Sequence, residues 1–465
     1  MPRFTTSTVT EVIMDEQIIF SLLEQRNFKE LKPILSEMNG ADVAHILSEV
    51  DENDLPVVFR LLPKDLAAET FVEMDSDLQE ILIRRFSDKE LKQIMDELYV
   101  DDAVDLIEEM PASLVRRILQ QADAETRSAI NTILQYPEDS AGSIMTTEYV
   151  YLYPKMTVEE SFAQIRKNGI DKETVYTCYV IDDCRHLLGL VTVKDLLLHS
   201  YETKVEDIME DHVIYIETHA DKETAAQMFD KYSFLAIPVV DSEIRLVGII
   251  TIDDAMDVLQ EENTEDIAKM AAVKPSDKPY LKTSVFAIWR NRIPWLLVLM
   301  VSATFTGLIL NTFESKLSLI SSVLFACVPM IMDTGGNAGS QASVTVIRSL
   351  ALNEITTKDA FRVLWKEIRA SLLLAASLAV ACFGKLMLVD NLLFGYKDYT
   401  PFTCLVVSLA LMCTVVIAKL VGCMLPMLAK KVKLDPAVVA SPFITTIVDA
   451  LSLILYCGLA IALLG

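Results

Sequence analysis

The feature that most constrains the fold is a set of five long apolar stretches after Pro279. They cover about residues 284–310, 317–347, 368–389, 402–427 and 437–464. A helix of roughly 20 residues crosses the hydrocarbon core of about 30 Å, and a helix satisfies its own backbone hydrogen bonds there. The sequence therefore predicts a multi-pass membrane protein in which residues 279–465 form a transmembrane domain of five helices.

The first part of the chain has a very different composition. Residues 1–280 hold 57 Asp and Glu against 26 Lys and Arg, a formal charge of −31, whereas residues 281–465 hold 9 against 15, a charge of +6. An acidic surface of this size repels nucleic acid, so it favours cationic partners such as metal ions or basic proteins, or it serves solubility alone. The opening residues show no apolar segment before a small-residue cleavage site, so we expect no cleaved signal peptide and a cytoplasmic N-terminus.

Basic residues between the apolar stretches predict their orientation. They gather at three places, namely before the first stretch, between the second and third, and between the fourth and fifth. Because basic connections stay on the cytoplasmic side, these places should face the cytoplasm of a bacterial-type plasma membrane, the inner membrane where there are two. The connections NTFESK and VDNLLFGYKDYT would then lie outside, as would the C-terminus.

The second apolar stretch carries polar residues at membrane depth, where a central charge costs about 2.5–3.5 kcal/mol on insertion scales. In its run PMIMDTGGNAGSQ, Asp333, Asn337 and Gln341 recur every four residues, as on one helix face. The glycines of the run permit either close helix approach or local unwinding. We interpret this face as pore-lining. Asp333 itself either attracts ions to the inner mouth or caps a helix.

The last apolar stretch holds a second polar stripe, in which Ser441, Thr445 and Asp449 recur every four residues. An unpaired carboxylate in hydrocarbon must be protonated or must face water and cations. We therefore interpret Asp449 as lining an ion pathway. The alternatives are a buried protonated acid or a pair with Lys419. Oxygen ligands without a His or thiolate cluster suit a hard cation such as Mg²⁺ better than Zn²⁺ or Cu⁺.

Motifs of enzymes are missing from the sequence. The five His and eight Cys form no HExxH or CxxC pattern, and no P-loop or nucleophile and base pair is visible. Six Cys lie in apolar stretches, and Cys178 and Cys184 lie in the acidic part, which fits reduced structural thiols. An enzyme is therefore the weakest class of function.

Residues 1–138 are expected to form an α-helical superhelix, because short amphipathic segments repeat there. Asp42 begins DVAHILSEV and Asp65, 23 positions further on, begins DLAAETFVEM, while AVDLIEEM, which ends at Met110, is interpreted as a third copy. Apolar segments between the copies would supply the second helix of each unit. A plain helical bundle is the alternative.

Residues 139–262 contain a duplication in which β-branched strands alternate with helices. The segment GLVTVKDLL, which begins at Gly189, corresponds to GIITIDDAM, which begins at Gly248, and each copy follows the order strand, helix, strand, strand, helix. This duplication resembles a tandem pair of cystathionine-β-synthase (CBS) modules, here residues 139–202 and 203–262.

The CBS resemblance implies a nucleotide site in this pair. Its matching residues, Thr192 and Asp195 in one copy and Thr251 and Asp254 in the other, can hold the ribose of an adenine nucleotide such as ATP. The competing interpretation is that each Thr and Asp cap the following helix.

A charged connecting helix is expected within residues 257–278, where it would link the CBS pair to the membrane and end before Pro275. Glu262, Glu265 and Asp266 stand at i, i+3 and i+4, so their carboxylates share one helix face.

These segments, in this order, resemble the MgtE family of magnesium channels over the full length of the chain. GGNAGSQ in the second apolar stretch and LDP followed by SPFITTIVD in the fifth carry the likeness in the membrane half. The resemblance implies a homodimer with its ion path on the two-fold axis, places the pore aspartate on Asp449, and implies recognition of a largely hydrated Mg²⁺ by outer-shell oxygens.

The resemblance also implies regulatory Mg²⁺ sites between the helical domain, the CBS pair and the connecting helix. The acidic residues that match them are Asp102, Asp105, Glu223, Asp254, Glu262, Glu265 and Asp266, and Asp101 could exchange roles with Asp102. Two carboxylates about 4 Å apart repel by roughly 4 kcal/mol at an effective dielectric near 20, and a bridging dication reverses that. High cytoplasmic Mg²⁺ should therefore clamp these surfaces together and close the pore.

The sequence thus predicts a channel that imports Mg²⁺ and is gated by cytoplasmic Mg²⁺. Two alternatives remain open at this level. One is a carrier of Mg²⁺, Mn²⁺ or Co²⁺ coupled to Na⁺ or H⁺, and the other is a membrane-tethered nucleotide sensor that transports nothing.

Overall fold

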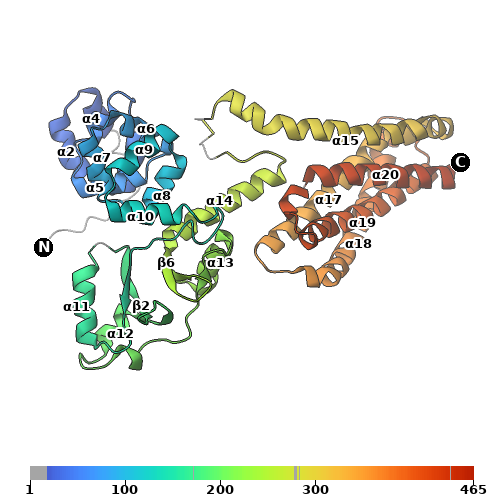
Figure 1. Ribbon diagram of the computed structural model, residues 1–465. Coiled ribbons are helices and arrows are strands. Elements are labelled where there is room, and N and C mark those ends of the chain that lie inside the picture. Colours follow the sequence, from blue (N-terminus) through green and yellow to red (C-terminus); the bar gives the residue numbers. More distant parts are fainter. Residues whose placement is uncertain (1–17, 171, 277–279, 282, 440) are drawn as a thin grey trace. The chain divides into compact units, whose positions relative to one another are not determined.

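The computed structural model describes residues 18–170, 172–276, 280–281, 283–439 and 441–465 (Figure 1). The chain divides into two compact units, residues 1–259 and residues 260–465. The first unit, called the soluble unit below, holds a helical domain and two small sheets. The second, called the membrane unit below, holds the long apolar helices.

The helical domain consists of short helices in two rows. One row stacks α3, α5, α7 and α9 on one another in turn, while α4 packs on α6 and α8 on α10 in the other. After α2 (Phe28–Ser36), the first row comprises α3 (Gly40–Ser48), α5 (Lys64–Val72), α7 (Asp88–Met95) and α9 (Ala112–Gln121). The second comprises α4 (Leu55–Phe59), α6 (Ser76–Arg85), α8 (Val100–Glu109) and α10 (Ala124–Ile133). Each row buries apolar side chains such as Leu47, Phe71, Leu82 and Leu91 in one shared core.

The two rows confirm the repeat but correct its phase. Asp88, which is 23 positions after Asp65, begins α7, so α7 is the third member of the row that contains α3 and α5. The segment AVDLIEEM was expected there, but it forms α8 of the other row. The apolar pattern of α8 resembled that of α3 and α5, whereas DKELKQIM of α7 is mostly polar and buries only one narrow face.

Each CBS module contains a three-stranded sheet with one parallel and one antiparallel pair. In the first module the strand order is β1-β2-β3, and in the second it is β4-β5-β6. The first comprises β1 (Tyr149–Leu152), α11 (Val158–Asn168), β2 (Thr174–Ile181), β3 (Leu187–Thr192) and α12 (Val193–Leu198). The second comprises β4 (Ile216–Glu217), α13 (Lys222–Tyr232), β5 (Ala236–Val240), β6 (Leu246–Thr251) and α14 (Ile252–Met270). The expected order of elements is therefore correct in both copies.

The expected connecting helix is the continuation of a CBS helix. A single α14 runs without interruption from Ile252 to Met270, so the last helix of the second module and the connecting helix are one element. It ends earlier than expected, at Met270, because Ala272 adopts a left-handed conformation with φ of 53° that stops the helix.

The described residues of the second unit form five long helices after α14. They are α15 (Val285–Ile320), α17 (Val328–Ala351), α18 (Ala360–Lys385), α19 (Pro401–Lys431) and α20 (Ser441–Leu464), with the short α16 (Ser322–Ala326) before α17 and a π-helical turn, η3 (Leu386–Leu393), after α18. By length and apolarity, the described residues give four candidate membrane spans: Val285–Ile320, Thr357–Leu393, Pro401–Lys431 and Pro442–Leu464. The polar run of α17 explains why its 24 residues are not a fifth.

One predicted boundary is wrong. NTFESK was expected to connect the first two apolar stretches, but it lies inside α15. The segment contains no Pro or Gly, so nothing in it interrupts a helix. The 36 residues of α15 end instead at Ile320, because the backbone of Ser321 is extended, and at about 54 Å the helix is longer than the hydrocarbon core of about 30 Å.

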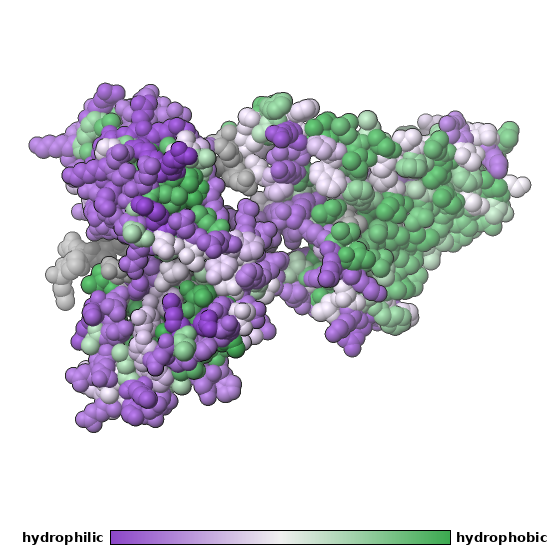
Figure 2. Space-filling model, in the orientation of Figure 1, coloured by the Kyte–Doolittle hydropathy of each residue, from purple (hydrophilic) through white to green (hydrophobic). Residues whose placement is uncertain are grey.

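Surface chemistry distinguishes the two units. Figure 2 shows apolar side chains covering the visible face of the long helices, whereas hydrophilic side chains cover most of the helical domain. Leu373, Val380 and Phe305 are examples of large apolar residues at least two-thirds exposed on the second unit. This is the surface that a lipid-facing bundle requires.

Candidate ion-binding sites

Glycines of α17 allow close packing with two other helices. A Cβ atom on Gly335 would lie 2.8 Å from Ser452 Oγ of α20 and equally close to Thr414 Cγ2 of α19, and one on Gly422 of α19 would collide with the carbonyl oxygen of Gly339. Because α17 is a continuous helix, these glycines serve close approach, and the alternative of local unwinding is wrong.

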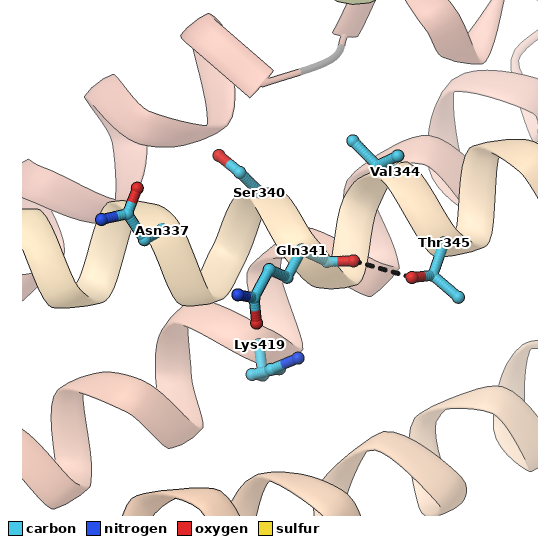
Figure 3. Close-up of a pocket in the computed structure, with 6 residues that line it drawn as sticks. All are labelled: Asn337, Ser340, Gln341, Val344, Thr345 and Lys419. Atoms are coloured by element: carbon cyan, nitrogen blue, oxygen red, sulfur yellow. Dashed lines mark hydrogen bonds between the residues drawn. The ribbon is translucent and has the colours of Figure 1, made fainter. Parts of the chain in front are cut away.

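The predicted polar stripe of α17 is exposed in the single chain. Asp333, Asn337 and Gln341 all lie on its exposed face. Asn337, Ser340, Gln341, Val344, Thr345 and Lys419 line an open cavity of about 780 Å³ beside it (Figure 3). Polar groups at membrane depth need water, ions or another protein surface, so this face is unsuited to contact with lipid.

The polar stripe of α20 faces the glycine run. A Cβ atom on Gly336 would lie 2.9 Å from Thr445 Cγ2 and 3.7 Å from Asp449 Oδ1, so both side chains lie next to α17. Asp333 is close enough to act electrostatically on Asp449. The side chain of Ser441, the third predicted member of the stripe, lies outside the described residues. The structure thus brings together Asp333, Thr445 and Asp449.

Lys419 is a buried cation of the membrane unit, with only 8% of its surface exposed. Among the described residues, no ion pair joins it to Asp449. Its side chain instead lines the cavity, where the amide of Gln341 points toward it (Figure 3). Asp449 is therefore left to interact with oxygen-bearing groups and with whatever enters from solvent.

A second group of acids lies in the first unit, between the helical domain and the CBS modules. We define the carboxylate cluster as Asp101, Asp102 and Asp105 of α8, Glu173 before β2, and Asp254 in the first turn of α14. Loss of hydration on burial, followed by the charges of Asp254 and Asp102, raises the pKa of Asp105 to about 7, although part of this side chain remains accessible to solvent. Burial, followed by the charge of Asp253, raises the pKa of Asp102 to about 6.

The other members of the cluster behave alike. Burial, together with the charges of neighbouring carboxylates, raises the pKa of Glu173 to about 8 and that of Asp254 to about 7. The pKa of Asp101, which is 6% exposed, is also raised by burial and by the charge of Asp254. Among the described residues, none of the ion pairs with a basic side chain involves these five carboxylates. Among the residues that the structure describes, Glu173 Oε2 is buried without a hydrogen-bond partner, which leaves this oxygen able to bind a cation.

A hydrogen bond ties the two sides of this cluster together. Glu148 of the first CBS module accepts a hydrogen bond of 3.0 Å from the backbone amide of Val100, at the first residue of α8. The cluster is therefore built on a fixed contact between α8 and the CBS pair. Its oxygens, without nitrogen or sulfur donors, fit a hard dication such as Mg²⁺.

The CBS motif residues act as helix caps. Thr192 and Asp195 form a reciprocal capping box at the start of α12, and Thr251 Oγ1 donates a hydrogen bond of 2.6 Å to Asp254 Oδ2. The capping interpretation therefore has direct support. Asp254 is at the same time a member of the carboxylate cluster.

The remaining predicted acids lie elsewhere. Glu223 is in the first turn of α13, where Gln227 donates a hydrogen bond to it. In the second unit, Lys269 Nζ lies 2.8 Å from both Glu265 Oε1 and Asp435 Oδ2, so the end of α14 is held to the connection before α20.

The neighbouring acids of α14 belong to the same region. Burial and the charge of Asp435 raise the pKa of Asp266. Glu262 lies on the same helix, one turn earlier.

Comparison with known proteins matches each part of the chain. Residues 38–139 match the MgtE intracellular N domain, residues 141–202 and 205–261 match CBS domains, and residues 328–459 match the divalent cation transporter domain of MgtE. The chain is 36% identical over 458 residues to the magnesium transporter MgtE of Thermus thermophilus, covering 97% of this chain and 99% of that protein. The chain belongs to the MgtE family of magnesium transporters.

Other MgtE proteins agree with this assignment. The magnesium transporter MgtE of Bacillus subtilis is 31% identical over 457 residues, which cover 98% of this chain and 99% of that one. A crystal structure of the cytosolic domain of the Mg²⁺ channel MgtE in complex with ATP matches with a TM-score of 0.50 and 34% identity, covering 52% of this chain and 99% of that one. The helical domain and CBS pair of this chain thus correspond to a domain solved separately in a relative.

Within the MgtE domains, the carboxylate cluster joins acids from three places in the sequence. Its α8 members lie in the MgtE intracellular N domain, and Glu173 and Asp254 lie in the first and second CBS domains. Sequence reasoning found Asp102, Asp105 and Asp254 but not Glu173. The dipeptide Glu173-Thr174 at a strand start gives no local signal, because its position in the cluster depends on how the first module packs on α8.

Proposed function

We propose that this chain forms a homodimeric channel that imports Mg²⁺ across a bacterial-type plasma membrane and closes when cytoplasmic Mg²⁺ is high. The observation that carries the proposal is the arrangement in the membrane unit: Asp449 and Thr445 look onto a polar face of α17 that the single chain leaves exposed. A second copy placed against that face would enclose carboxylate, hydroxyl and amide oxygens. The N-terminus would be cytoplasmic and the C-terminus outside.

Hydrated Mg²⁺ suits such a lining. Because Mg²⁺ gives up its water reluctantly, oxygens at outer-shell distance can hold it without removing the inner waters. Asp449 would supply the charge, while Asn337, Gln341 and Thr445 would orient water molecules. Weak, shared contacts of this kind also let the ion leave, as conduction requires.

The carboxylate cluster supports regulation by the same ion. Without a cation, its members raise one another's pKa, so the closed contact between α8 and the CBS pair is opposed by repulsion or must take up protons. Bound Mg²⁺ would supply positive charge there and favour the closed contact. This is a shift between two states by an ion that binds one of them more tightly.

ATP is the second proposed ligand, by extension from the relative whose cytosolic domain was solved with it. Thr192 and Asp195 would hold its ribose, with Thr251 and Asp254 as the equivalent pair. Because both pairs already cap helices, the nucleotide would share these side chains with the caps.

Single-channel recording from purified protein in bilayers tests the proposal. A Mg²⁺ gradient alone should drive a current, and millimolar Mg²⁺ on the side of the soluble unit should lower the open probability. Flux of Mg²⁺, Mn²⁺ or Co²⁺ that requires a Na⁺ or H⁺ gradient would instead identify a carrier. A folded protein that binds ATP and carries no ion would be a membrane-tethered sensor.

A further inference from the structure

Three different metal-ligating side chains converge on the turn between β2 and β3 of the first CBS module. Ligand atoms of Asp182, Cys184 and His186 all lie within 4.8 Å of one another. Asp182 Oδ2 and His186 Nδ1 are 2.8 Å apart, and Cys184 is exposed. The set offers one oxygen, one sulfur and one nitrogen, unlike the oxygen-only sites described above.

The equivalent turn of the second module has the same backbone. Asp182 Oδ1 accepts hydrogen bonds of 2.8 Å from the amides of Cys184 and His186. At the turn between β5 and β6, Asp241 Oδ1 accepts hydrogen bonds of 2.9 Å from the amides of Glu243 and Arg245. In both turns the fourth residue has positive φ, 68° at Arg185 and 60° at Ile244.

The side chains of the two turns differ in a way that points to a cation. In the second turn, Arg245 forms ion pairs with Asp241, at 3.8 Å, and with Glu243. A fixed guanidinium therefore neutralises the acids there. The first turn has a thiol and an imidazole at the corresponding positions, and in both turns the backbone is held by hydrogen bonds to the aspartate side chain and between backbone groups. Neither Cys184 nor His186 is therefore needed to form the turn.

Arg185, the basic residue of the first turn, does not pair with Asp182 as Arg245 pairs with Asp241. Arg185 directs its guanidinium to the hydroxyl of Tyr149, away from the three ligands. Among the described residues, the one ion pair of Asp182 is with His186. His186 thus takes the place of Arg245 beside the aspartate, and an imidazole, unlike a guanidinium, can bind a metal ion.

We propose that the β2–β3 turn binds a transition-metal dication of the Zn²⁺ class through Asp182, Cys184 and His186, with water in the fourth position. Ligands on one tetrahedral ion lie roughly 3.3–3.8 Å apart, so small side-chain rotations would bring these atoms into place. Binding breaks the S–H bond of Cys184, forms a metal–sulfur bond and releases the proton to solvent, while neutral His186 donates a ring nitrogen. Thiolate and imidazole select against Mg²⁺.

The site would act on the joint between the two modules. The amide of Leu246 donates to the carbonyl of Arg185 at 2.9 Å, and the amide of Leu187 donates to the carbonyl of Ile244 at 3.0 Å. The two turns are therefore linked by their backbones. A bound ion would stiffen this link, so a transition metal could influence the soluble unit independently of the carboxylate cluster.

Cobalt binding to the full-length protein in detergent, under reducing conditions, tests the proposal. One equivalent of Co²⁺ should give a near-ultraviolet sulfur-to-cobalt charge-transfer band. Zn²⁺ should remove the band, and a large excess of Mg²⁺ should not. Cys184→Ser should abolish it, and His186→Gln should weaken Co²⁺ binding. The matched control is Cys178→Ser, which removes the buried cysteine of the same module and should keep the band.

The internal duplication offers a gain-of-function test. Glu243→Cys with Arg245→His would place the same three ligand types on the second turn, so sulfur-bound Co²⁺, measured by the charge-transfer band, should rise from one ion to two per chain. A graft without a second ion would contradict the claim that this turn geometry makes the site. Absence of the band in the unaltered protein, or its survival in Cys184→Ser, would overturn the proposal.

Discussion

In the soluble unit, acids from α8, from the start of β2 and from α14 lie together and raise one another's pKa, whereas in the membrane unit Asp449 has one carboxylate neighbour, Asp333, and lies near the hydroxyl group of Thr445. The first arrangement stores repulsion that a dication can reverse, which suits a switch between two states. The second has two carboxylates and a hydroxyl group, fewer charges than the five of the cluster, which suits an ion that must also leave. The difference suggests that the density of carboxylates separates sensing from passage.

The contrast between the two units depends most on Asp449, which should be required for Mg²⁺ flux. Asp449→Asn should reduce Mg²⁺ flux into proteoliposomes by about 100-fold, equivalent to about 3 kcal/mol, because it removes the charge that attracts the ion. Asp398→Asn is the control, since it removes the same charge from an exposed position in the connection before α19. Normal flux through Asp449→Asn in folded protein would exclude Asp449 from the pathway.

Neutralising the carboxylate cluster should have the next largest effect. With Asp102, Asp105 and Asp254 all changed to Asn, the soluble unit should be more stable in EDTA by about 2–4 kcal/mol, because close carboxylates no longer repel. Millimolar Mg²⁺ should then add no further stability and should no longer lower the open probability.

Thermal unfolding with and without Mg²⁺ measures this effect. The control is Asp42→Asn with Asp65→Asn, two exposed acids of the same helical domain. A variant of the cluster that Mg²⁺ still stabilises as it does the parent would show that the regulatory ion binds elsewhere.

Close packing of α17 predicts a smaller effect, confined to the membrane unit. Gly422→Ala should lower its stability by about 1–3 kcal/mol, because the added methyl group meets the carbonyl oxygen of Gly339. Gly384→Ala and Gly458→Ala are matched controls, since a Cβ atom there has no neighbour within 4 Å. Melting temperatures in detergent would measure it, and equal values for all three variants would contradict the predicted contact.

The smallest expected effect is that of pH on the stability of the soluble unit in EDTA. The raised pKa values of Asp102 and Asp254, about 6 and about 7, mean that the folded state binds more protons than the unfolded state above pH 4. Stability should therefore fall by about 1–2 kcal/mol as pH rises from 5 to 8, after allowance for coupling and solvent exposure.

Mg²⁺ should remove most of this pH dependence, because the ion binds the deprotonated cluster and its affinity rises with pH. Chemical unfolding at pH 5, 6.5 and 8 measures both effects. Stability that rises with pH in EDTA would argue against repulsion within the cluster.

Local patterns predicted much of this fold. The order of strands and helices in the CBS duplication was predicted correctly, because each copy contains strands of alternating apolar and polar residues separated by turn residues. Phase and boundaries were harder. The polar α7 was overlooked in favour of α8, and NTFESK was interpreted as a connection although α15 continues through it. Helix ends depend on tertiary contacts that short polar segments do not report.

For the sites too, features within one element were predicted, whereas features that depend on packing between elements were not. Periodicity predicted that Asn337 and Gln341 share one face of α17, and both are exposed there, while their pore-lining role and that of Asp449 stay predictions. Glu173 was missed, because it reaches Asp102 and Asp254 only through packing of three separate segments. Cys184 was interpreted as a structural thiol, and its approach to His186 depends on a turn that spacing alone does not specify.

The unbroken α14 has a mechanical consequence. Asp254 lies in its first turn and Lys269 in its last, and no joint separates them over the 19 residues, about 28 Å. A tilt of about 5° at the first turn would move the far end by roughly 2 Å. Because the helix is continuous, a small tilt at Asp254 is amplified along its own length toward Lys269.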